Sequence, residues 1–487
     1  MKRYFSIFIL QALVAISIIA QPVRLKLPRQ INVPNYNHYA PSLSANGLTM
    51  IYCSDYYVTE GNSVDMKITT SKGLDNWGSS EDVTAVNKSG TLNQYGAHCI
   101  SADGNKIYFT SRKTGGVGGF DIWVTEKKGG KWATAQNLGK PVNSTGSDGY
   151  PSLSADGKTL YFLRCATMAN SGCQDCKLFM SEGKGQDFYQ PAVQIPMSGH
   201  ILYPRISKDG NSLTFSSTKT GGKGGYDIYQ MKKQGDKWSD PVNMEFLNTP
   251  ADEVYADIPS QAEAILYSTK VDGYLTLFRA KLPERFHPDK VIVISSKINV
   301  GPNTGPIGFI QISDNKTGAP ISITKIEKDG KISAVLPTGK VYDVAVVSGK
   351  DKFYWSGTYD AINLTRTQKE EPEIVLELLQ KNKLYYGNKA LFDSTSYQTL
   401  PGTALECKRL SKIFLSHPEW KAEFILFPSG VSNNPPADGL SAFEKMKASI
   451  QPELSKSGIS TERITYVNGF EKPEEEDSFA GWGIKFY

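Results

Sequence analysis

Three of the six cysteines share one short segment, and they are the residues here with the clearest capacity for chemistry. The Cys173-x-x-Cys176 spacing is typical of zinc and redox sites. A tetrahedral zinc site needs four ligands, however, and neither a histidine nor a fourth cysteine lies nearby in the sequence. Disulfides are typical of exported chains, so if this chain carries an export signal we expect a disulfide here and not a metal site, with Cys165 bonded to Cys173 or to Cys176. We expect the remaining three cysteines to be isolated thiols: Cys53, Cys99 and Cys407.

Two glycine clusters and three histidines are further sites where chemistry is conceivable. The clusters at 115–119 and 221–225 have the composition of phosphate-binding loops, but neither ends in Gly-Lys-Ser/Thr and no helical pattern follows. We therefore interpret them as hairpin turns. His38, His98 and His200 each precede a β-rich run and could face the central channel of the ring that is described below, but no acidic partner accompanies them. We expect no catalytic residue, no metal and no cofactor.

The elements that position these residues are set by a repeat in the first half of the chain. A Ser-x-Asp/Asn-Gly phrase recurs with its Asp or Asn at positions 46, 103, 156 and 209, and each copy precedes a short apolar-aromatic run. An Asn-Gly or Asp-Gly pair between β-rich runs is a strong hairpin signal. A spacing of more than fifty residues between copies indicates a repeat architecture built from β-sheets.

Each unit extends to four strands, which is the size of one propeller blade. A fifth unit, from Tyr255 to Phe278, lacks its fourth strand, and the segment from Arg24 to Pro34 resembles that missing strand. We predict that the N-terminal segment completes the last blade and so closes the ring. The count is five blades, with six as the alternative.

The segment Pro151–Phe162 reads Pro-Ser-Leu-Ser-Ala-Asp-Gly-Lys-Thr-Leu-Tyr-Phe. It resembles the motif of TolB-type, WD40-like (PD40) propellers, and the resemblance covers about residues 22–285. Propellers of this kind mostly bind proteins, although some gate a peptidase. A peptidase requires a hydrolase domain with a Gly-x-Ser-x-Gly elbow, and the sequence has none.

The start of the chain has the pattern of a secretory signal peptide. Lys2 and Arg3 precede an apolar stretch, and Ile18-x-Ala20 is an acceptable cleavage site, so we assign residues 1–20 to the signal. No cysteine for a lipid anchor follows, and no other apolar run is long enough to span a membrane. With 54 basic and 49 acidic residues before cleavage, the charge balance favours neither nucleic acid nor an anionic membrane surface.

Two smaller regions follow the ring, which we assign to residues 21–286. Residues 290–380 alternate β runs and turns, with Thr317-Gly318-Ala319-Pro320-Ile321, Asp329-Gly330 and Leu336-Pro337. This series of motifs resembles the sequence pattern of the carboxypeptidase-regulatory, transthyretin-like β-sandwich. Such sandwiches serve as spacers or docking modules in exported proteins.

Residues 384–487 alternate strands and helices and resemble the OmpA C-terminal domain, the peptidoglycan-binding module of the outer membrane. The resemblance rests on Phe392-Asp393-Ser394 and on Gly458-Ile459 with Arg463-Ile464. The family's binding Asp and Arg, which hold the ammonium and carboxylate of diaminopimelate, fall at Ser429 and near Glu444. We therefore expect peptidoglycan binding to be weak or absent.

We therefore expect a mainly β chain: a five-bladed (alternatively six-bladed) propeller, a transthyretin-like β-sandwich and a small α/β domain like the OmpA C-terminus. The series resembles an envelope subunit of the type IX secretion and gliding apparatus. It implies a periplasmic, outer-membrane-associated scaffold that is not an enzyme and binds proteins of a secretion or motility complex. The alternatives are a peptidoglycan tether and a hydrolase or lyase that uses the propeller channel.

Overall fold

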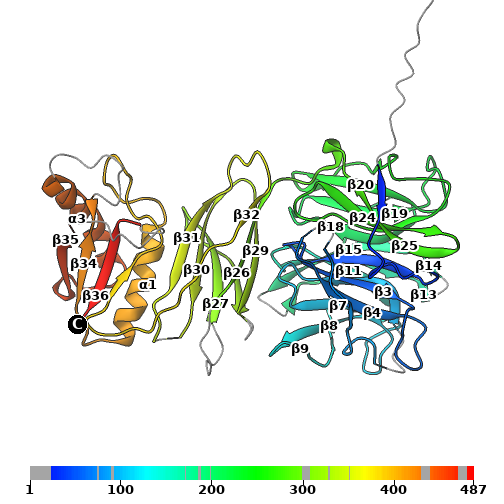
Figure 1. Cartoon of the computed structure of the whole chain (residues 1–487), viewed down its shortest axis with the longest axis horizontal. Coiled ribbons are helices and arrows are strands. Elements are labelled where there is room, and N and C mark those ends of the chain that lie inside the picture. Colours follow the sequence, from blue (N-terminus) through cyan, green and yellow to red (C-terminus); the bar gives the residue numbers. More distant parts are fainter. Residues whose placement is uncertain are drawn as a thin grey trace, which may run out of the picture.

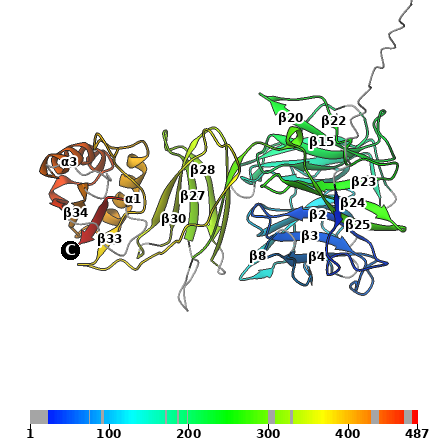
Figure 2. The same ribbon diagram turned by 45° about the horizontal axis from the view of Figure 1, so that its top comes forward.

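The computed structural model places three parts side by side along the long axis of the molecule (Figures 1 and 2). It describes residues 23–73, 76–88, 93–169, 172–184, 188–197, 199–298, 308–326, 330–349, 351–428, 439–469 and 480–487. The predicted signal peptide, residues 1–20, lies outside the described residues. None of the described helices is long and apolar enough to cross a membrane.

The first part consists of five antiparallel sheets and one short hairpin. The first sheet contains β2 (His38–Leu43), β3 (Thr49–Ser54), β4 (Asp65–Thr70) and β5 (Glu81–Asp82). The second contains β6 (Asn93–Ile100), β7 (Lys106–Ser111), β8 (Asp121–Lys128), β9 (Lys131–Trp132) and β10 (Gln136–Asn137). The third contains β11 (Ser147–Leu153), β12 (Thr159–Cys165), β15 (Lys177–Lys184), β16 (Phe188–Tyr189) and β17 (Val193–Gln194), and it carries the hairpin β13 (Thr167–Ala169) and β14 (Gly172–Gln174). The fourth contains β18 (Ile201–Ile206), β19 (Ser212–Ser217), β20 (Asp227–Gln234), β21 (Lys237–Trp238) and β22 (Val242–Asn243). The fifth contains β23 (Glu253–Asp257), β24 (Ala264–Val271), β25 (Tyr274–Lys281) and β1 (Arg24–Lys26).

These sheets form a closed, propeller-like ring. The first strand of each sheet contacts that of the next, in the order β2, β6, β11, β18 and β23, and β23 contacts β2 again. The predicted closure is confirmed, because β1 pairs antiparallel with β25 and Arg24 lies opposite Ala280. The predicted turns are also confirmed: the glycines of the four repeat phrases have φ between 70° and 75°. This left-handed backbone is the conformation that glycine adopts most readily.

The second part contains two sheets that share one core. One sheet has the order β29 (Lys331–Pro337), β26 (Val291–Lys297), β32 (Gln368–Glu370). The other has the order β28 (Pro320–Ile326), β27 (Gly308–Asp314), β30 (Val341–Val347), β31 (Trp355–Asp360). Ile292 and Leu336 of the first sheet and Ile310 and Val344 of the second belong to one buried cluster. A 3-10 turn, η1 (Glu284–Phe286), precedes β26.

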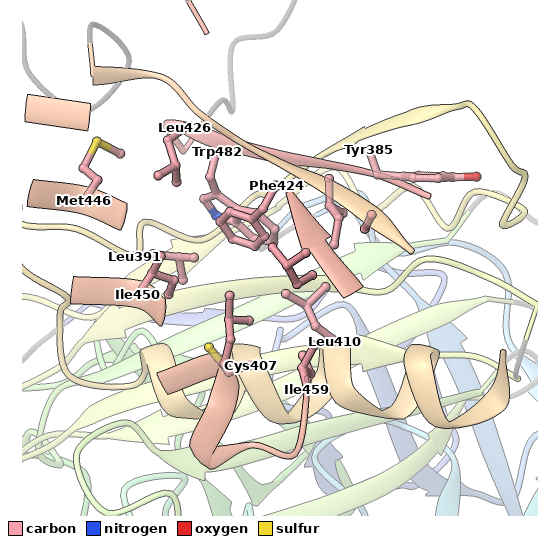
Figure 3. Packing of buried hydrophobic residues seen from close by; sticks show 14 of the residues in the cluster. Tyr385, Leu391, Cys407, Leu410, Phe424, Leu426, Met446, Ile450, Ile459 and Trp482 are labelled. Atoms are coloured by element: carbon pink, nitrogen blue, oxygen red, sulfur yellow. The ribbon is translucent and has the colours of Figure 1, made fainter. Parts of the chain in front are cut away.

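The third part is a four-stranded sheet with two helices, α1 (Thr403–Ser416) and α3 (Gly439–Lys456), in a region where the sequence predicts alternating strands and helices. The strand order is β33 (Leu384–Tyr386), β36 (Trp482–Phe486), β34 (Ala422–Leu426) and β35 (Ile464–Asn468). A 3-10 turn, η2 (Thr461–Arg463), precedes β35 in the chain. Strand β36, which occupies an inner position, was not predicted from the sequence. Its Trp482 is fully buried and stacks on Phe424 with ring centroids 5.4 Å apart (Figure 3).

Candidate functional sites

The centre of the ring is shaped by one unusual backbone position in each sheet. The inner strand of each sheet has a bulge, and each bulge contains one residue with left-handed φ: Ala40, Gly96, Tyr150, Tyr203 and Tyr255. A bulge redirects the side chain that it carries and increases the local twist of the strand. Four of these five residues are not glycine, so the ring holds them in a conformation that costs free energy.

Tyrosine side chains from these bulges meet across the ring. The ring centroids of Tyr203 and Tyr255 lie 3.8 Å apart, and Tyr150 lies 5.1 Å from Tyr203. Tyr39, from β2, lies 5.4 Å from Tyr255. A Cβ atom on Gly96 would lie 2.3 Å from Cε1 of Tyr255, although these residues belong to sheets that are not neighbours. The glycine thus makes room for a tyrosine from across the ring, and the tilted and edge-to-face tyrosine side chains occupy the centre at this level.

These tyrosines are poorly suited to acid–base chemistry at neutral pH. Burial raises the pKa of Tyr203 and of Tyr255 well above the ordinary tyrosine value. A general acid or base acts best when its pKa lies near the working pH. The cluster is therefore better suited to packing than to proton transfer.

The three histidines singled out by the sequence do not meet at one site in the described structure. Nε2 of each lies at hydrogen-bond distance from a backbone carbonyl: 3.0 Å from Val33 for His38, 2.9 Å from Ala40 for His98 and 2.9 Å from Cys173 for His200. Among the described residues, the one group of ligand-type side chains that could hold a metal contains cysteines and no histidine.

His98 also lies beside a cysteine, but the pair lacks the features of a nucleophile and its base. Nδ1 of His98 is 3.9 Å from Sγ of Cys53, and both side chains are buried. Burial raises the pKa of Cys53 to about 12, and burial followed by the charge of Arg205 lowers the pKa of His98 to about 3. A catalytic thiol needs a lowered pKa, so this environment favours an inert buried thiol.

The three-cysteine segment forms one cluster at the third sheet. Cys165 and Cys176 form a disulfide, which is one of the two pairings that the sequence left open. Cys173 is a buried free thiol on β14, and the hydroxyl oxygen of Tyr150 lies 3.2 Å from its sulfur. The other cysteines within the described residues are buried free thiols: Cys53, Cys99 and Cys407.

A cleft of about 880 Å³ separates the ring from the second part. One wall is formed by the repeat turns at 101–106 and 153–158, and the other by β27 and β28. Phe309 and Ile323, which line the cleft, are 47% and 46% exposed. Its charged lining residues are of both signs: Lys106, Lys158, Lys325, Lys340, Asp103, Glu126 and Asp156. Protein–protein interfaces combine an apolar centre with a polar rim, and this lining supplies both kinds of side chain.

Direct contacts connect the ring to the second part beside this cleft. The backbone N–H of Asp289 donates to the carboxylate of Asp209 at 2.8 Å. Ala45 and Ala102, from two repeat turns, pack with Val291 and Val293 of β26 in one buried cluster. The repeat turns thus form hairpins within the ring and also provide the surface that contacts the second part.

A buried network of four charges connects the second part to the third. The carboxylate of Asp343, on β30, accepts hydrogen bonds from Lys389 Nζ at 2.8 Å and from Arg409, on α1. Arg409 also donates to Glu406 at 2.7 Å, and Glu406 accepts from Ser356 of β31 at 2.9 Å. Two cations thus face two carboxylates, so the formal charge of the network is zero. A buried charge is tolerated when it is paired and hydrogen-bonded in this way.

The two positions taken from the OmpA resemblance have different outcomes. Ser429 lies outside the described residues. Glu444 is an exposed residue of α3, and its carboxylate lies 3.6 Å from Lys447 Nζ. The loss of peptidoglycan binding therefore remains a prediction.

Sequence reasoning missed both the tyrosine cluster and the charge network. The cluster had a visible signal, because Tyr150 and Tyr203 stand at the same offset before Asp156 and Asp209 of their repeats. The network had none, because its members are spread between positions 343 and 409 and belong to regions that resemble different families.

No family model and no curated protein matches this chain. Among solved structures, it is similar to a putative TolB from Agrobacterium tumefaciens, with 14% identity, 61% of this chain and 89% of that chain covered, and a TM-score of 0.30. It is also similar to TolB from Acinetobacter baumannii at 14% identity, where the match covers 51% of this chain and 55% of that chain and the TM-score is 0.33. A third similar structure is an endo-arabinase from Bacteroides thetaiotaomicron VPI-5482 at 16% identity, where the match covers 53% of this chain and 97% of that chain and the TM-score is 0.38. All three TM-scores lie below 0.5, and no statement about the fold or the activity of this chain rests on these likenesses.

Proposed function

We propose that this protein is a non-enzymatic docking protein of the bacterial cell envelope, which binds partner proteins of an outer-membrane machine. The observation that carries this proposal is the tyrosine packing at the ring centre. A hydrolase or lyase that works in a propeller channel needs space and polar groups there. In this ring, Tyr39, Tyr150, Tyr203 and Tyr255 occupy that position, and the outer surfaces remain for binding.

The cleft between the ring and the second part is the surface best suited to a protein partner. Phe309 and Ile323 supply exposed apolar area, and lysines and acidic residues surround them. Apolar contacts at the centre of such a surface supply most of the binding energy, and charges at the rim select the partner.

The finer assignment follows the order of the parts. We propose that the ring is a five-bladed propeller, that the second part is a carboxypeptidase-regulatory-like sandwich and that the third is a degenerate OmpA-like domain. The protein would then act in the periplasm near the outer membrane, in a complex of the type IX secretion or gliding kind. With Ser429 and Glu444 at the family's Asp and Arg positions, the third part would contact protein and not peptidoglycan.

Purification of the tagged full chain after cross-linking in native cells tests the docking proposal. We expect one or a few envelope proteins to be recovered with the wild type and to be reduced at least several-fold with Phe309→Asp. Val193→Asp is the control, because Val193 is also exposed but does not line the cleft. Recovery of no envelope protein, or equal recovery with both variants, would overturn the proposed surface.

A pull-down on purified sacculi tests the third part separately. We expect the full chain to be retained no better than an unrelated exported protein. Strong retention that free diaminopimelate competes away would show that the binding site has been rebuilt with other residues.

A further inference from the structure

The three-cysteine cluster places a free thiol beside an existing disulfide. Cys165, at the end of β12, is bonded to Cys176, and Cys173 lies between them in sequence on β14. The three sulfur atoms all lie within 4.8 Å of one another. The thiol is therefore close to both sulfurs of the bond, and such proximity is what thiol–disulfide exchange requires. Figure 1 labels β13 and β14 on the side of the ring away from β26.

The surroundings of Cys173 act on its thiol in two directions. The residue is 7% exposed, and this burial raises the pKa of its thiol. The hydroxyl of Tyr150, 3.2 Å from the sulfur, acts in the opposite direction, because a hydroxyl that donates to sulfur stabilises the thiolate. Tyr203, Tyr226 and His200 also lie in these surroundings, and the hydroxyl of Tyr226 lies 3.4 Å from Nδ1 of His200.

We propose that Cys165, Cys173 and Cys176 form a thiol–disulfide exchange site, in which the disulfide moves between the Cys165–Cys176 pairing and a pairing that includes Cys173. The Cys173 thiol loses its proton to solvent, and its thiolate attacks one sulfur of the disulfide. A new S–S bond forms to Cys173 as the bond between Cys165 and Cys176 breaks. The departing sulfur keeps the electron pair of the broken bond and takes up a proton, so one disulfide and one thiol remain and no oxidant or reductant is consumed.

The exchange has a route to the ring centre through Tyr150. This residue contacts the Cys173 sulfur and also packs edge-to-face against Tyr203, whose ring contacts that of Tyr255 at a tilt of 37°. When Cys173 becomes part of the disulfide, its sulfur moves toward Cys165 or Cys176, and the contact with the hydroxyl must change. The face of the ring that carries the hairpin therefore has two covalent forms with different contacts to the tyrosines.

The isomers can be separated because the sequence offers cleavage points between the cysteines. Met168 lies between Cys165 and Cys173, and Asp175 lies between Cys173 and Cys176. The full chain, purified without reductant, is held in mildly alkaline buffer, quenched with acid, denatured and alkylated at its free thiols. Cleavage at Met168 with cyanogen bromide and before Asp175 with a protease then assigns the label by mass spectrometry. We expect the label to be shared between Cys173 and at least one of Cys165 and Cys176.

Three variants make the result decisive. Cys173→Ser removes the attacking thiol, so label at Cys165 and Cys176 should disappear. Cys176→Ser should pair Cys165 with Cys173 after air oxidation, and Cys53→Ser, a buried thiol on another sheet, should leave the distribution unchanged.

Tyr150→Phe should slow the appearance of label several-fold, and Tyr226→Phe should not. The proposal is overturned if the wild type is labelled at Cys173 alone within this cluster, or if Cys165 and Cys173 both stay reduced in the Cys176→Ser variant.

Discussion

Replacement of Asp343 by alanine should loosen the third part of the molecule from the second. The Asp343 carboxylate is fully buried and accepts hydrogen bonds from both cations of the network, Lys389 and Arg409. Without it, the two cations face one carboxylate, Glu406, and one positive charge has no counter-charge. Removing one partner of a buried ion pair costs ~3–5 kcal/mol. For a urea dependence of ~1–3 kcal/mol per molar, the unfolding midpoint should fall by at least ~1 M.

The reactivity of Cys407 measures the unfolding of α1, the helix that carries Arg409. Cys407 lies on α1, two residues before Arg409, and its side chain is fully buried (Figure 3). Burial also raises the pKa of its thiol to about 12, so the folded protein should react slowly with a thiol reagent. Short pulses of labelling at increasing urea concentration, read out at the Cys407 peptide, give the midpoint for α1.

The matched control is Glu444→Ala, which removes an exposed partner of Lys447. An exposed pair contributes ~0–1 kcal/mol, so its midpoint should barely move. Asp343→Asn keeps an acceptor oxygen but loses the charge, so its unfolding midpoint should lie between those of Asp343→Ala and Glu444→Ala. Equal midpoints for Asp343→Ala and Glu444→Ala would refute the reasoning that the network stabilises this interface.

Three further predictions concern the ring. Gly96→Ala should destabilise the ring by at least ~2 kcal/mol, because the new methyl group meets the Tyr255 ring and φ is +85°. Gly115→Ala, where φ is +94° and the space is open, should cost only ~1 kcal/mol. Urea unfolding of the two variants measures the difference. Burial lowers the pKa of His98 to about 3, so below about pH 6.5 the unfolded chain binds one more proton than the folded chain. The free energy of unfolding should therefore fall by about 1.4 kcal/mol per pH unit on acidification. Unfolding midpoints measured between about pH 6 and 4 should show this slope, and His98→Gln should reduce it. Deletion of residues 23–27 removes β1 and exposes the edge of β25, and size-exclusion chromatography with light scattering should then show self-association that the full chain lacks.

The parts of the fold that were predictable are those encoded by local signals. The Asp-Gly and Asn-Gly pairs require left-handed backbone, and Gly47, Gly104, Gly157 and Gly210 adopt it. The pairing of β1 was also predictable, because the fifth unit lacks a strand and the N-terminal segment has the matching pattern.

The parts that were not predictable depend on where distant residues meet. Asp343 and Arg409 are ordinary charged residues in sequence, and only the docking of α1 against β30 and β31 makes them a buried pair. The inner strand β36 was missed for a related reason: Trp482 and Phe486 follow a stretch rich in glutamate, and a single glycine, Gly481 with φ of +80°, marks the return of the chain to the sheet. The cysteine pairing was narrowed by spacing to two alternatives, and geometry decided between them.

The closure of the ring also has a mechanical consequence. Because β1 and β25 are antiparallel and Arg24 lies opposite Ala280, the chain enters and leaves the ring at the same end of one strand pair. Tension between the N-terminus and the second part would therefore pull this pair apart one hydrogen bond at a time, as a zipper opens, without loading its bonds together in shear. β1 contributes only three residues to the pairing. Under load, this seam should open before any other sheet of the ring, and the protein would lengthen under a small force while its other four sheets stayed intact.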